Sequence, residues 1–384
     1  MAAGIAGSNP AGHPDKQNLA RIARFCYDQI NMSEEQPKFE RPPVGMHGNL
    51  DEEKKKYLSE EIGKRFKEGN MTEFSEEFIE EINTAEYDKR SYEIDFINAA
   101  NQIINKILEN YGLEAFNIPV KNIHILPEGI IGKVSRGNLD NTAFYDMRRQ
   151  IIVLDASKNR FSPLETARHI LHEMLHMKGF ISYDVANDET MGDRGYKQNV
   201  RRAGFMTYGS FKKSEQGMFY ENFRGINEAI VSELEYAHTG RVVMVSDSPE
   251  VKDELKRLNS DKTKNDKINF AKKYNLKPEE ITWIDEGGNH AQREVYRAHR
   301  KVLHYLAKET AEDEGKMEEE VLDVFFKAHF DGNIMPVARL VENSFGPNSF
   351  RDLGMMDDTE MSARRMLDSL KAKRRTLKKS RGLE

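Results

Sequence analysis

The sequence predicts an α+β fold with a small mixed sheet, a buried helix next to it and a mainly helical C-terminal part. Short β-branched runs at residues 121–126 and 150–154 are bounded by Pro-Glu-Gly and Asp-Ala-Ser, which is typical of strands. A capped amphipathic helix is predicted at about 163–178. Charged segments with helical periodicity occupy most of the remaining chain, before and after this core.

The helix at about 163–178 is justified by its two ends. Ser162 is suited to the N-cap position, Pro163 to the first helical position and Glu165 to the closing position of a capping box. Gly179 is typical of a helix end. Between them, apolar residues at helical spacing predict a face that is buried against the rest of the domain.

Four parts follow from the composition along the chain. Residues 1–48 contain Gly and Pro clusters and are expected to form a flexible leader. Residues 49–90 are a charged N-terminal region, with helices predicted at 51–67 and 73–82. Residues 91–345 form the main domain, and residues 346–384 form a basic C-terminal tail.

The main domain opens with a helix at about 92–111, whose apolar face includes Ile94, Ile97 and Ile104. A lysine-rich, weakly periodic stretch near 247–277 is expected to be a surface insertion. Further helices are predicted at 290–309, at 318–329 and from Pro336.

Composition limits the class of protein. The chain has 384 residues, of which 32% are charged, and no apolar run approaches the roughly 18 residues that a membrane-spanning helix needs. No membrane insertion is therefore expected. Cys26 is the single cysteine, which excludes an intrachain disulfide framework and a cysteine-rich metal site. The N-terminus has no basic start or long apolar run, so a cytoplasmic location is expected rather than secretion.

His172, Glu173 and His176 carry the chemistry of the predicted helix. Residues four apart on an α-helix differ by about 40° in direction, so His172 and His176 can reach one metal ion. Glu173 follows the first histidine and can accept a proton from a water on that ion without being a ligand. This spacing predicts a zinc-dependent hydrolase, with His169 as a neighbouring packing residue.

A zinc site needs a third protein ligand, and Glu228 is the first candidate. The segment Asn227-Glu228-Ala229 resembles the second-helix motif of the gluzincin group of zincin metallopeptidases, in which the glutamate is the third ligand. The resemblance implies a zincin-like domain at 91–345 with zinc held by His172, His176 and Glu228. Gluzincins commonly carry an acid four residues later, where this chain has Ser232; Glu233 is one residue beyond.

A metzincin arrangement is the alternative. Gly179 follows His176 by three residues, and Met206-Thr207-Tyr208 is similar to the methionine turn of that group. The third metzincin histidine would then fall at position 182, which is Ser182 and a poor zinc ligand. The available ligand favours the gluzincin arrangement.

The resemblance implies hydrolysis of a peptide or protein substrate, with Glu173 as general base and then as proton donor to the leaving amine. A donor to the oxyanion is also needed. Tyr208, Tyr220, Tyr236 and His238 are the candidates by their position in the sequence. The alternative is a zincin-like scaffold without catalysis that acts through its charged helices or its basic tail.

The basic tail differs in charge from the rest of the chain. Residues 362–384 contain nine Lys or Arg and two acids, a charge of +7, whereas the whole chain carries −6 and the remainder therefore −13. Such a segment can bind nucleic acid, an acidic protein surface or anionic lipid. It can equally be a solvated tail that pairs with the acidic body of the same molecule.

Overall fold

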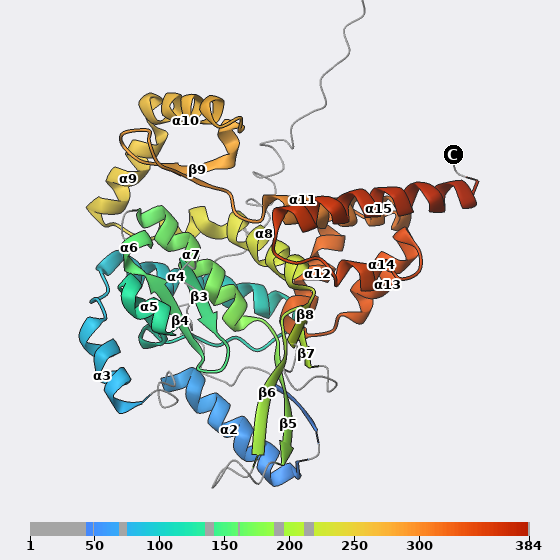
Figure 1. Cartoon of the computed structure of the whole chain (residues 1–384), viewed down its shortest axis with the longest axis horizontal. Coiled ribbons are helices and arrows are strands. Elements are labelled where there is room, and N and C mark those ends of the chain that lie inside the picture. The colour runs from blue at the N-terminus through green and yellow to red at the C-terminus, as the bar shows by residue number, and fades with distance from the viewer. Residues whose placement is uncertain are drawn as a thin grey trace, which may run out of the picture. The chain divides into compact units, whose positions relative to one another are not determined.

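The computed structural model describes residues 44–48, 50–68, 75–134, 142–159, 162–187, 196–210 and 219–382, which fall in one compact unit, Pro37–Glu384. This unit is a mixed α/β structure with small sheets and many helices (Figure 1). The coarse fold class predicted from the sequence is therefore confirmed. Of the predicted leader, residues 1–43, with Cys26, lie outside the described residues.

The first sheet contains both predicted strands. Its order is β2-β4-β3, where β2 is Ile123–Leu126, β3 is Ala143–Asp146 and β4 is Ile151–Asp155. β2 runs parallel to β4, whereas β3 is antiparallel to it. β4 is central and buried along its whole length, which explains why its sequence is apolar without alternation.

Three helices pack together beside this sheet and form the centre of the main core: α4 (Ser91–Asn110), α7 (Pro163–Lys178) and α8 (Arg224–Val243). α7 also contacts β3. The helix predicted at 92–111 is thus confirmed, but Ile94 is exposed and not part of the apolar face. Tyr92 and Phe96 occupy the buried face near this end of the helix, which turns Ile94 outward.

A second sheet was not predicted. Its order is β1-β5-β6-β7-β8, made of β1 (Val44–Gly48), β5 (Ile181–Asn187), β6 (Tyr196–Ala203), β7 (Met206–Ser210) and β8 (Phe219–Asn222). Gly204 joins β6 to β7 with φ +55°. A Cβ atom at this position would lie 2.4 Å from the Asn227 Oδ1 atom of α8, so the close approach of turn and helix requires glycine.

The N-terminal region is helical, as its charge pattern predicted. The other elements before α7 are α2 (Glu52–Glu68), α3 (Glu76–Ala85), η1 (Val120–Asn122), α5 (Glu128–Val134) and α6 (Ala156–Asn159). The lysine-rich stretch that follows α8 contains ordered elements: α9 (Pro249–Asn259), α10 (Asp261–Lys273), η3 (Pro278–Glu280), β9 (Ile281–Ile284) and β10 (Ala291–Arg293).

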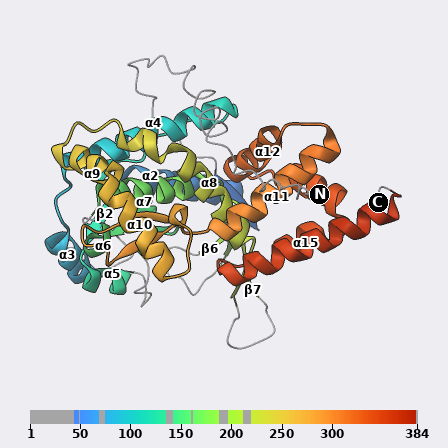
Figure 2. The same cartoon turned by 90° about the horizontal axis from the view of Figure 1, so that it is seen from above.

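The C-terminal part is helical, with α11 (Arg297–Glu314), α12 (Glu318–Asp331), α13 (Met335–Phe345), α14 (Ser349–Leu353) and α15 (Glu360–Ser380). The helix predicted at 290–309 begins seven residues later, because Ala291–Arg293 pair with β9 instead. α15 lies against α11 (Figures 1 and 2). Most of the segment predicted as a basic tail is therefore a packed helix. Among the described residues, no helix has the length and apolar character that crossing a membrane requires.

Candidate metal centre

α7 carries His172, Glu173 and His176 as the sequence predicted. The Ser162 Oγ atom accepts a hydrogen bond from the Glu165 backbone N–H at 3.3 Å, Pro163 is the first helical residue and the helix ends before Gly179. These local signals fix the start and end of the helix. The two histidines lie one turn apart in its second half.

α8 supplies the third predicted ligand. Its residue Glu228 is buried at the contact between α7 and α8. The neighbouring Asn227 ties this contact to the second sheet, since its Oδ1 atom accepts a hydrogen bond from the Phe205 backbone N–H at 3.0 Å. Its Nδ2 atom lies 3.4 Å from Nδ1 of His176. Asn227 therefore fixes the start of α8 against both the β6–β7 turn and α7.

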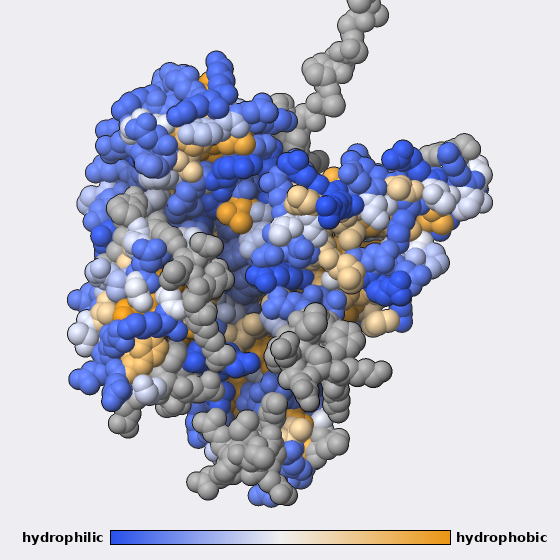
Figure 3. Space-filling model, viewed as in Figure 1, coloured by the Kyte–Doolittle hydropathy of each residue, from blue (hydrophilic) through white to orange (hydrophobic). Residues whose placement is uncertain are grey.

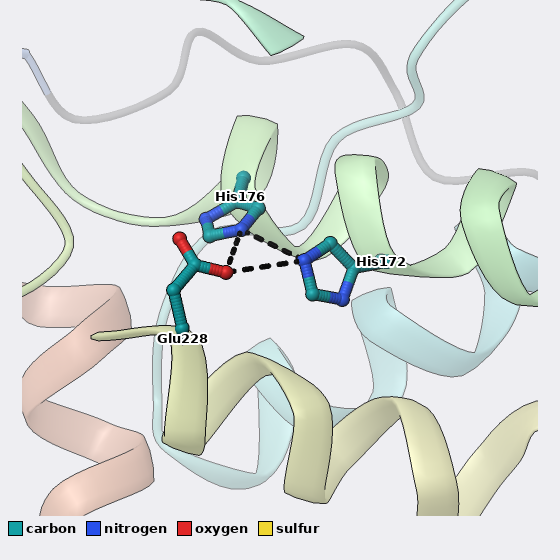
Figure 4. Close-up of side chains that lie close together, drawn as sticks. All are labelled: His172, His176 and Glu228. Atoms are coloured by element: carbon teal, nitrogen blue, oxygen red, sulfur yellow. Dashed lines mark hydrogen bonds and ion pairs between the residues drawn. The ribbon is translucent and has the colours of Figure 1, made fainter. Parts of the chain in front are cut away.

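The three predicted ligands come together at one point (Figure 4). The Nε2 atoms of His172 and His176 are 3.1 Å apart. The Glu228 Oε2 atom is 3.3 Å from the first of these nitrogens and 3.4 Å from the second. Among the described residues, this is the group of histidine, cysteine and acidic side chains whose ligand atoms could hold a metal ion.

The size of this triangle fits a small divalent cation. Zinc binds histidine nitrogen and carboxylate oxygen at about 2.0–2.1 Å in a tetrahedral arrangement, which places neighbouring ligand atoms roughly 3.3–3.4 Å apart. The three observed separations of 3.1, 3.3 and 3.4 Å are close to this value. A four-coordinate zinc ion held by these three ligands would have one further position for water or substrate.

The charges at the centre favour a bound cation. Burial raises the pKa of Glu228, but the charge of His176 and the hydrogen bond from His172 outweigh it and hold that pKa well below its usual range. For His172, burial has the opposite effect and lowers the pKa, but the hydrogen bonds of the ring to Glu228 and Glu235 raise this pKa overall. A carboxylate kept ionised in a buried place needs positive charge beside it, which either a proton or a metal ion can provide.

Glu235 orients His172 from the side opposite Glu228. Its Oε2 atom lies 3.0 Å from Nδ1 of His172, and its Oε1 atom accepts a hydrogen bond from Arg168 at 2.7 Å. Burial raises the pKa of Glu235, but the Arg168 charge and the His172 hydrogen bond lower it to about 2. An Nδ1–H bond to a carboxylate leaves Nε2 of His172 free to bind metal.

Glu235 thus supplies the carboxylate that supports a ligand histidine. From the sequence, this carboxylate was expected at position 232, which is Ser232, or one residue later at Glu233. Glu235 follows Glu228 by seven residues, or two helical turns, so the two carboxylates share one face of α8. Ser232 is buried with no carboxylate to offer. The helical period was the signal that could have identified Glu235 from the sequence.

We expect Glu235→Gln to weaken metal binding without abolishing it. The amide keeps the side-chain volume but loses the charge that stabilises the Nδ1–H group of His172, and such changes lower metal affinity by about 10- to 100-fold. Competition with a chromogenic zinc chelator measures this affinity. An affinity equal to that of the wild type would contradict the orienting role.

Glu233 turns away from the centre. Its Oε2 atom accepts hydrogen bonds from Arg300 at 2.7 Å and from Nε2 of His304 at 2.9 Å, while Nδ1 of His304 lies 2.8 Å from Glu318. Glu233 therefore links α8 to α11 and, through His304, to α12. Among the described residues, Glu233 forms no hydrogen bond or ion pair with the two predicted histidine ligands on α7.

Because of this link, the free energy of unfolding should fall as the pH becomes alkaline. Burial lowers the pKa of His304, but its bonds to Glu233 and Glu318 raise it to about 9, above the unfolded value of about 6.5. The stabilisation is therefore complete below about pH 6.5 and lost as the pH rises through 9. Denaturant unfolding should show His304→Gln less stable than the wild type at pH 6, by about 1 kcal/mol or less because the ring is partly exposed, and equal to it near pH 10.

Glu173 lies beside the triangle and is itself buried. Burial raises its pKa overall, and the charges of His172 and His176, followed by a hydrogen bond from the backbone of Tyr145 in β3, oppose that rise. The hydrogen bond positions the carboxylate between the metal-ligand group and the edge of the first sheet. A glutamate with a raised pKa can both take up and release a proton near neutral pH.

Tyr296 is an aromatic neighbour of the centre that sequence reasoning missed. Its ring stacks on His172, with centroids 6.1 Å apart and an interplanar angle of 12°. Burial raises the pKa of its hydroxyl, and the charges of Glu228, Asp358 and Glu173 raise it further, so the hydroxyl is neutral and can donate a hydrogen bond. The residue has φ +59° at the junction before α11, which no local pattern of the sequence predicted.

The four aromatic candidates chosen by sequence position differ in their surroundings. The Tyr208 hydroxyl lies 3.5 Å from the sulfur atoms of Met147 and Met206, and the negative charge of Glu228 contributes to its raised pKa after burial. Tyr236 lies under the Arg300 guanidinium, and His238 lies 3.4 Å from Arg241. The Tyr220 side chain lies outside the described part of the structure.

The residues of the alternative ligand arrangement lie in the second sheet. Ser182 is buried in β5, where it pairs with Gly45 and Arg202. Met206 begins β7 and pairs with Ala203, so the segment similar to a methionine turn is a strand. His169, one turn before His172, is not part of the group that could hold a metal.

Comparison of the chain with protein-family models, with curated proteins and with solved structures found no match.

Proposed function

We propose that the protein is a zinc-dependent metallopeptidase of the gluzincin type. The observation that carries this proposal is the triangle of two histidine nitrogens and one carboxylate oxygen, 3.1–3.4 Å apart, with the buried Glu173 beside it. Two imidazoles and a carboxylate are a common ligand set of catalytic zinc. A purely structural site has no need for an uncoordinated carboxylate next to the metal.

The surface above the centre is compatible with access by substrate. Figure 3 shows this face hollowed between the part that carries α9 and α10 and the part that carries α11 to α14, over the place where α7 and α8 lie in Figure 1. The walls of this hollow are mainly hydrophilic. A polar hollow over these two helices suits the hydrated backbone of a peptide.

The edge of the first sheet supports a peptide as substrate. β3 pairs with β4 on one side, and within the described residues the sheet ends there. The Asp155 N–H donates to the Thr142 carbonyl, so by the alternation of an antiparallel pair the backbone groups of Tyr145 point away from β4. The Tyr145 N–H group bonds Glu173. An extended peptide can add to such an edge through main-chain hydrogen bonds and reach Glu173.

The residues then have separate roles in hydrolysis. A divalent ion held by His172, His176 and Glu228 would supply a Lewis acid that acidifies a water molecule and polarises the peptide carbonyl. Glu173 takes a proton from the attacking water, whose oxygen bonds the carbonyl carbon, and delivers that proton to the nitrogen as the C–N bond breaks. The products are one carboxylate and one amine. Glu235 holds the His172 ring in place. Zinc is preferred because of the ligand set.

We assign the role of oxyanion donor to Tyr296, whose ring stacks on His172, and a pair of substitutions separates its role from that of Tyr208. We expect Tyr296→Phe to lower kcat on a cleaved peptide by about 100-fold, with KM and zinc content little changed, because one oxyanion donor is lost. Tyr208→Phe, which removes a hydroxyl bound to two methionine sulfurs, serves as the matched control and should change kcat much less. A larger effect of Tyr208→Phe would exchange the two roles.

The direct test of the proposal is cleavage of a peptide library by the zinc-loaded protein, with products identified by mass spectrometry. New carboxyl and amino termini should appear, and a chelator should stop their formation. The same treatment of His172→Ala should yield no product. Cleavage that persists in His172→Ala would assign the activity to a contaminant and overturn the proposal.

The scaffold alternative depended on the absence of a carboxylate at position 232. The contact of Glu235 with His172 supplies a carboxylate from two turns after Glu228 instead. The buried Glu173 also favours catalysis over a scaffold.

A further inference from the structure

α15 divides its basic residues between two faces. The face toward the body is buried or half-buried, and acids of the body neutralise its cations. Arg374 bonds Glu309 and Asp313, Lys373 bonds Asp352 at 2.6 Å, and Lys378 lies 3.9 Å from Glu309. Ala363 and Leu370 complete this face with apolar contacts. The predicted pairing of the segment with the acidic body therefore exists, but for these cations alone.

An adjoining side of the helix carries a second set of cations, in which Lys371 is half-buried and the others are exposed. We call this set the basic stripe: Arg364, Arg365, Lys371, Arg375 and Lys379. At 100° per residue these five positions fall within an arc of about 120° on one side of the helix. From Arg364 to Lys379 the stripe is about 22 Å long, at 1.5 Å per residue. Asp368 is the acid that falls within it.

No cation of the basic stripe has an acidic partner from another element among the described residues, although the Arg375 Nε atom donates to the Lys371 carbonyl within the helix. Among the ion pairs of the described residues, none involves Arg365, Arg375 or Lys379, and all three side chains are exposed. Arg364 pairs with Glu360 of the same helix while 73% of its side chain is exposed, and such surface pairs are weak. Lys371 lies 6.0 Å from the Tyr305 ring. The stripe is thus a row of cations available to a ligand.

We propose that the basic stripe of α15 binds the phosphate backbone of nucleic acid without sequence preference. Arginine and lysine at intervals of one or two helical turns can contact successive phosphates along a strand, and three of the five residues are arginines, which bind phosphate bidentately. The body-facing side of α15 is covered, so the helix cannot enter a groove deeply to read bases.

Two other ligands fit the stripe less well. A lipid surface is bound by helices that present apolar residues beside their cations, whereas the apolar residues of α15 face the body, with Met361 as an exposed exception. A protein interface is normally anchored by buried aromatic or aliphatic side chains, and the basic stripe has none. The charge of −13 outside residues 362–384 also confines a polyanion to this face.

The test is fluorescence anisotropy of the full-length protein with a labelled 20-nucleotide single strand and a labelled 20-base-pair duplex, at 50 to 200 mM salt. Wild type should bind at least one of them. If all five cations contact phosphates, the log–log salt slope is about −3.5 for the single strand and about −4.5 for the duplex, at about −0.7 and −0.9 per contact. The triple variant R365E/R375E/K379E should bind at least 10-fold more weakly, with a shallower slope.

The triple variant K256E/K272E/K277E is the matched control, because it makes the same charge change on exposed lysines of the α9–η3 segment. It should bind within about twofold of the wild type. Circular dichroism and unfolding temperature establish that both variants are folded. An equal loss in both variants would assign binding to net charge alone and overturn the proposal. Wild type that binds neither oligonucleotide at 50 mM salt, or that binds polyglutamate as tightly as either, would also overturn it.

Discussion

Glu173→Gln should abolish peptide hydrolysis while one zinc ion per chain remains bound. Glutamine keeps the volume and the buried position of Glu173, but it cannot accept the proton of the attacking water. General base catalysis by one side chain contributes about 100- to 10,000-fold, so we expect kcat/KM to fall by about 1,000-fold or more. The ligands His172, His176 and Glu228 are untouched, so zinc content should equal that of the wild type.

A control variant and two further measurements exclude loss of folding or loss of zinc as the cause of lost activity. Glu86→Gln changes a carboxylate at the end of α3 that bonds His124, remote in function from the metal centre, and should retain activity within about twofold. Zinc content and unfolding temperature are measured on every sample. Hydrolysis by a clean preparation of Glu173→Gln at the wild-type rate would remove Glu173 from the mechanism.

Removal of zinc should lower the stability of the wild type substantially. A ligand that binds the folded state alone adds about 4 kcal/mol when its free concentration is about 1,000 times Kd. The metal centre joins α7 to α8 at the middle of the main core, so its occupancy is coupled to folding of the whole unit. Denaturant unfolding with a chelator and with zinc restored measures the difference.

Two matched variants distinguish stabilisation by zinc bound at this centre from nonspecific effects of zinc or of the chelator. His176→Ala should unfold at the same denaturant concentration with and without zinc, because one ligand is lost. His238→Ala changes another buried histidine of α8 that lies against Arg241, and should keep the full response to zinc. Equal responses of His176→Ala and the wild type would place the zinc site elsewhere.

Local signals account for what the sequence predicted well. The boundaries of α7 follow from Ser162, Pro163 and Gly179, which act within one turn of the helix ends. The buried strands β2 and β4 followed from β-branched runs between turn residues. The meeting of His172, His176 and Glu228 followed from helical spacing combined with the gluzincin resemblance.

Contacts between distant segments explain what the sequence did not predict. The bond between Glu235 and His172 joins residues 63 positions apart and depends on how α7 packs against α8. Tyr296 reaches His172 from the junction before α11, through a left-handed backbone conformation. In the second sheet, β5 does alternate, with Ile181, Tyr183 and Val185 buried, but its partner β6 is largely polar, so no matching pattern indicated the neighbouring strand.

The basic segment shows the same distinction between composition and packing. Its charge was evident from the sequence, but the division of that charge between Arg374, which is buried against α11, and Arg375, which is exposed, depends on the orientation of α15. One residue along a helix changes the direction by about 100°. Composition alone could not separate the cations that stabilise the fold from those open to a ligand.

The most direct test of the central claim is the zinc-to-protein ratio of wild type, Glu228→Gln and Glu233→Gln, each dialysed against a weak chelator and shown to be folded. The two substitutions are isosteric, lie on the same helix and alter buried carboxylates, but only Glu228 faces the two histidines. We expect one zinc per chain in the wild type and in Glu233→Gln, and little or none in Glu228→Gln. One zinc retained by Glu228→Gln, or none bound by the reconstituted wild type, would contradict this expectation.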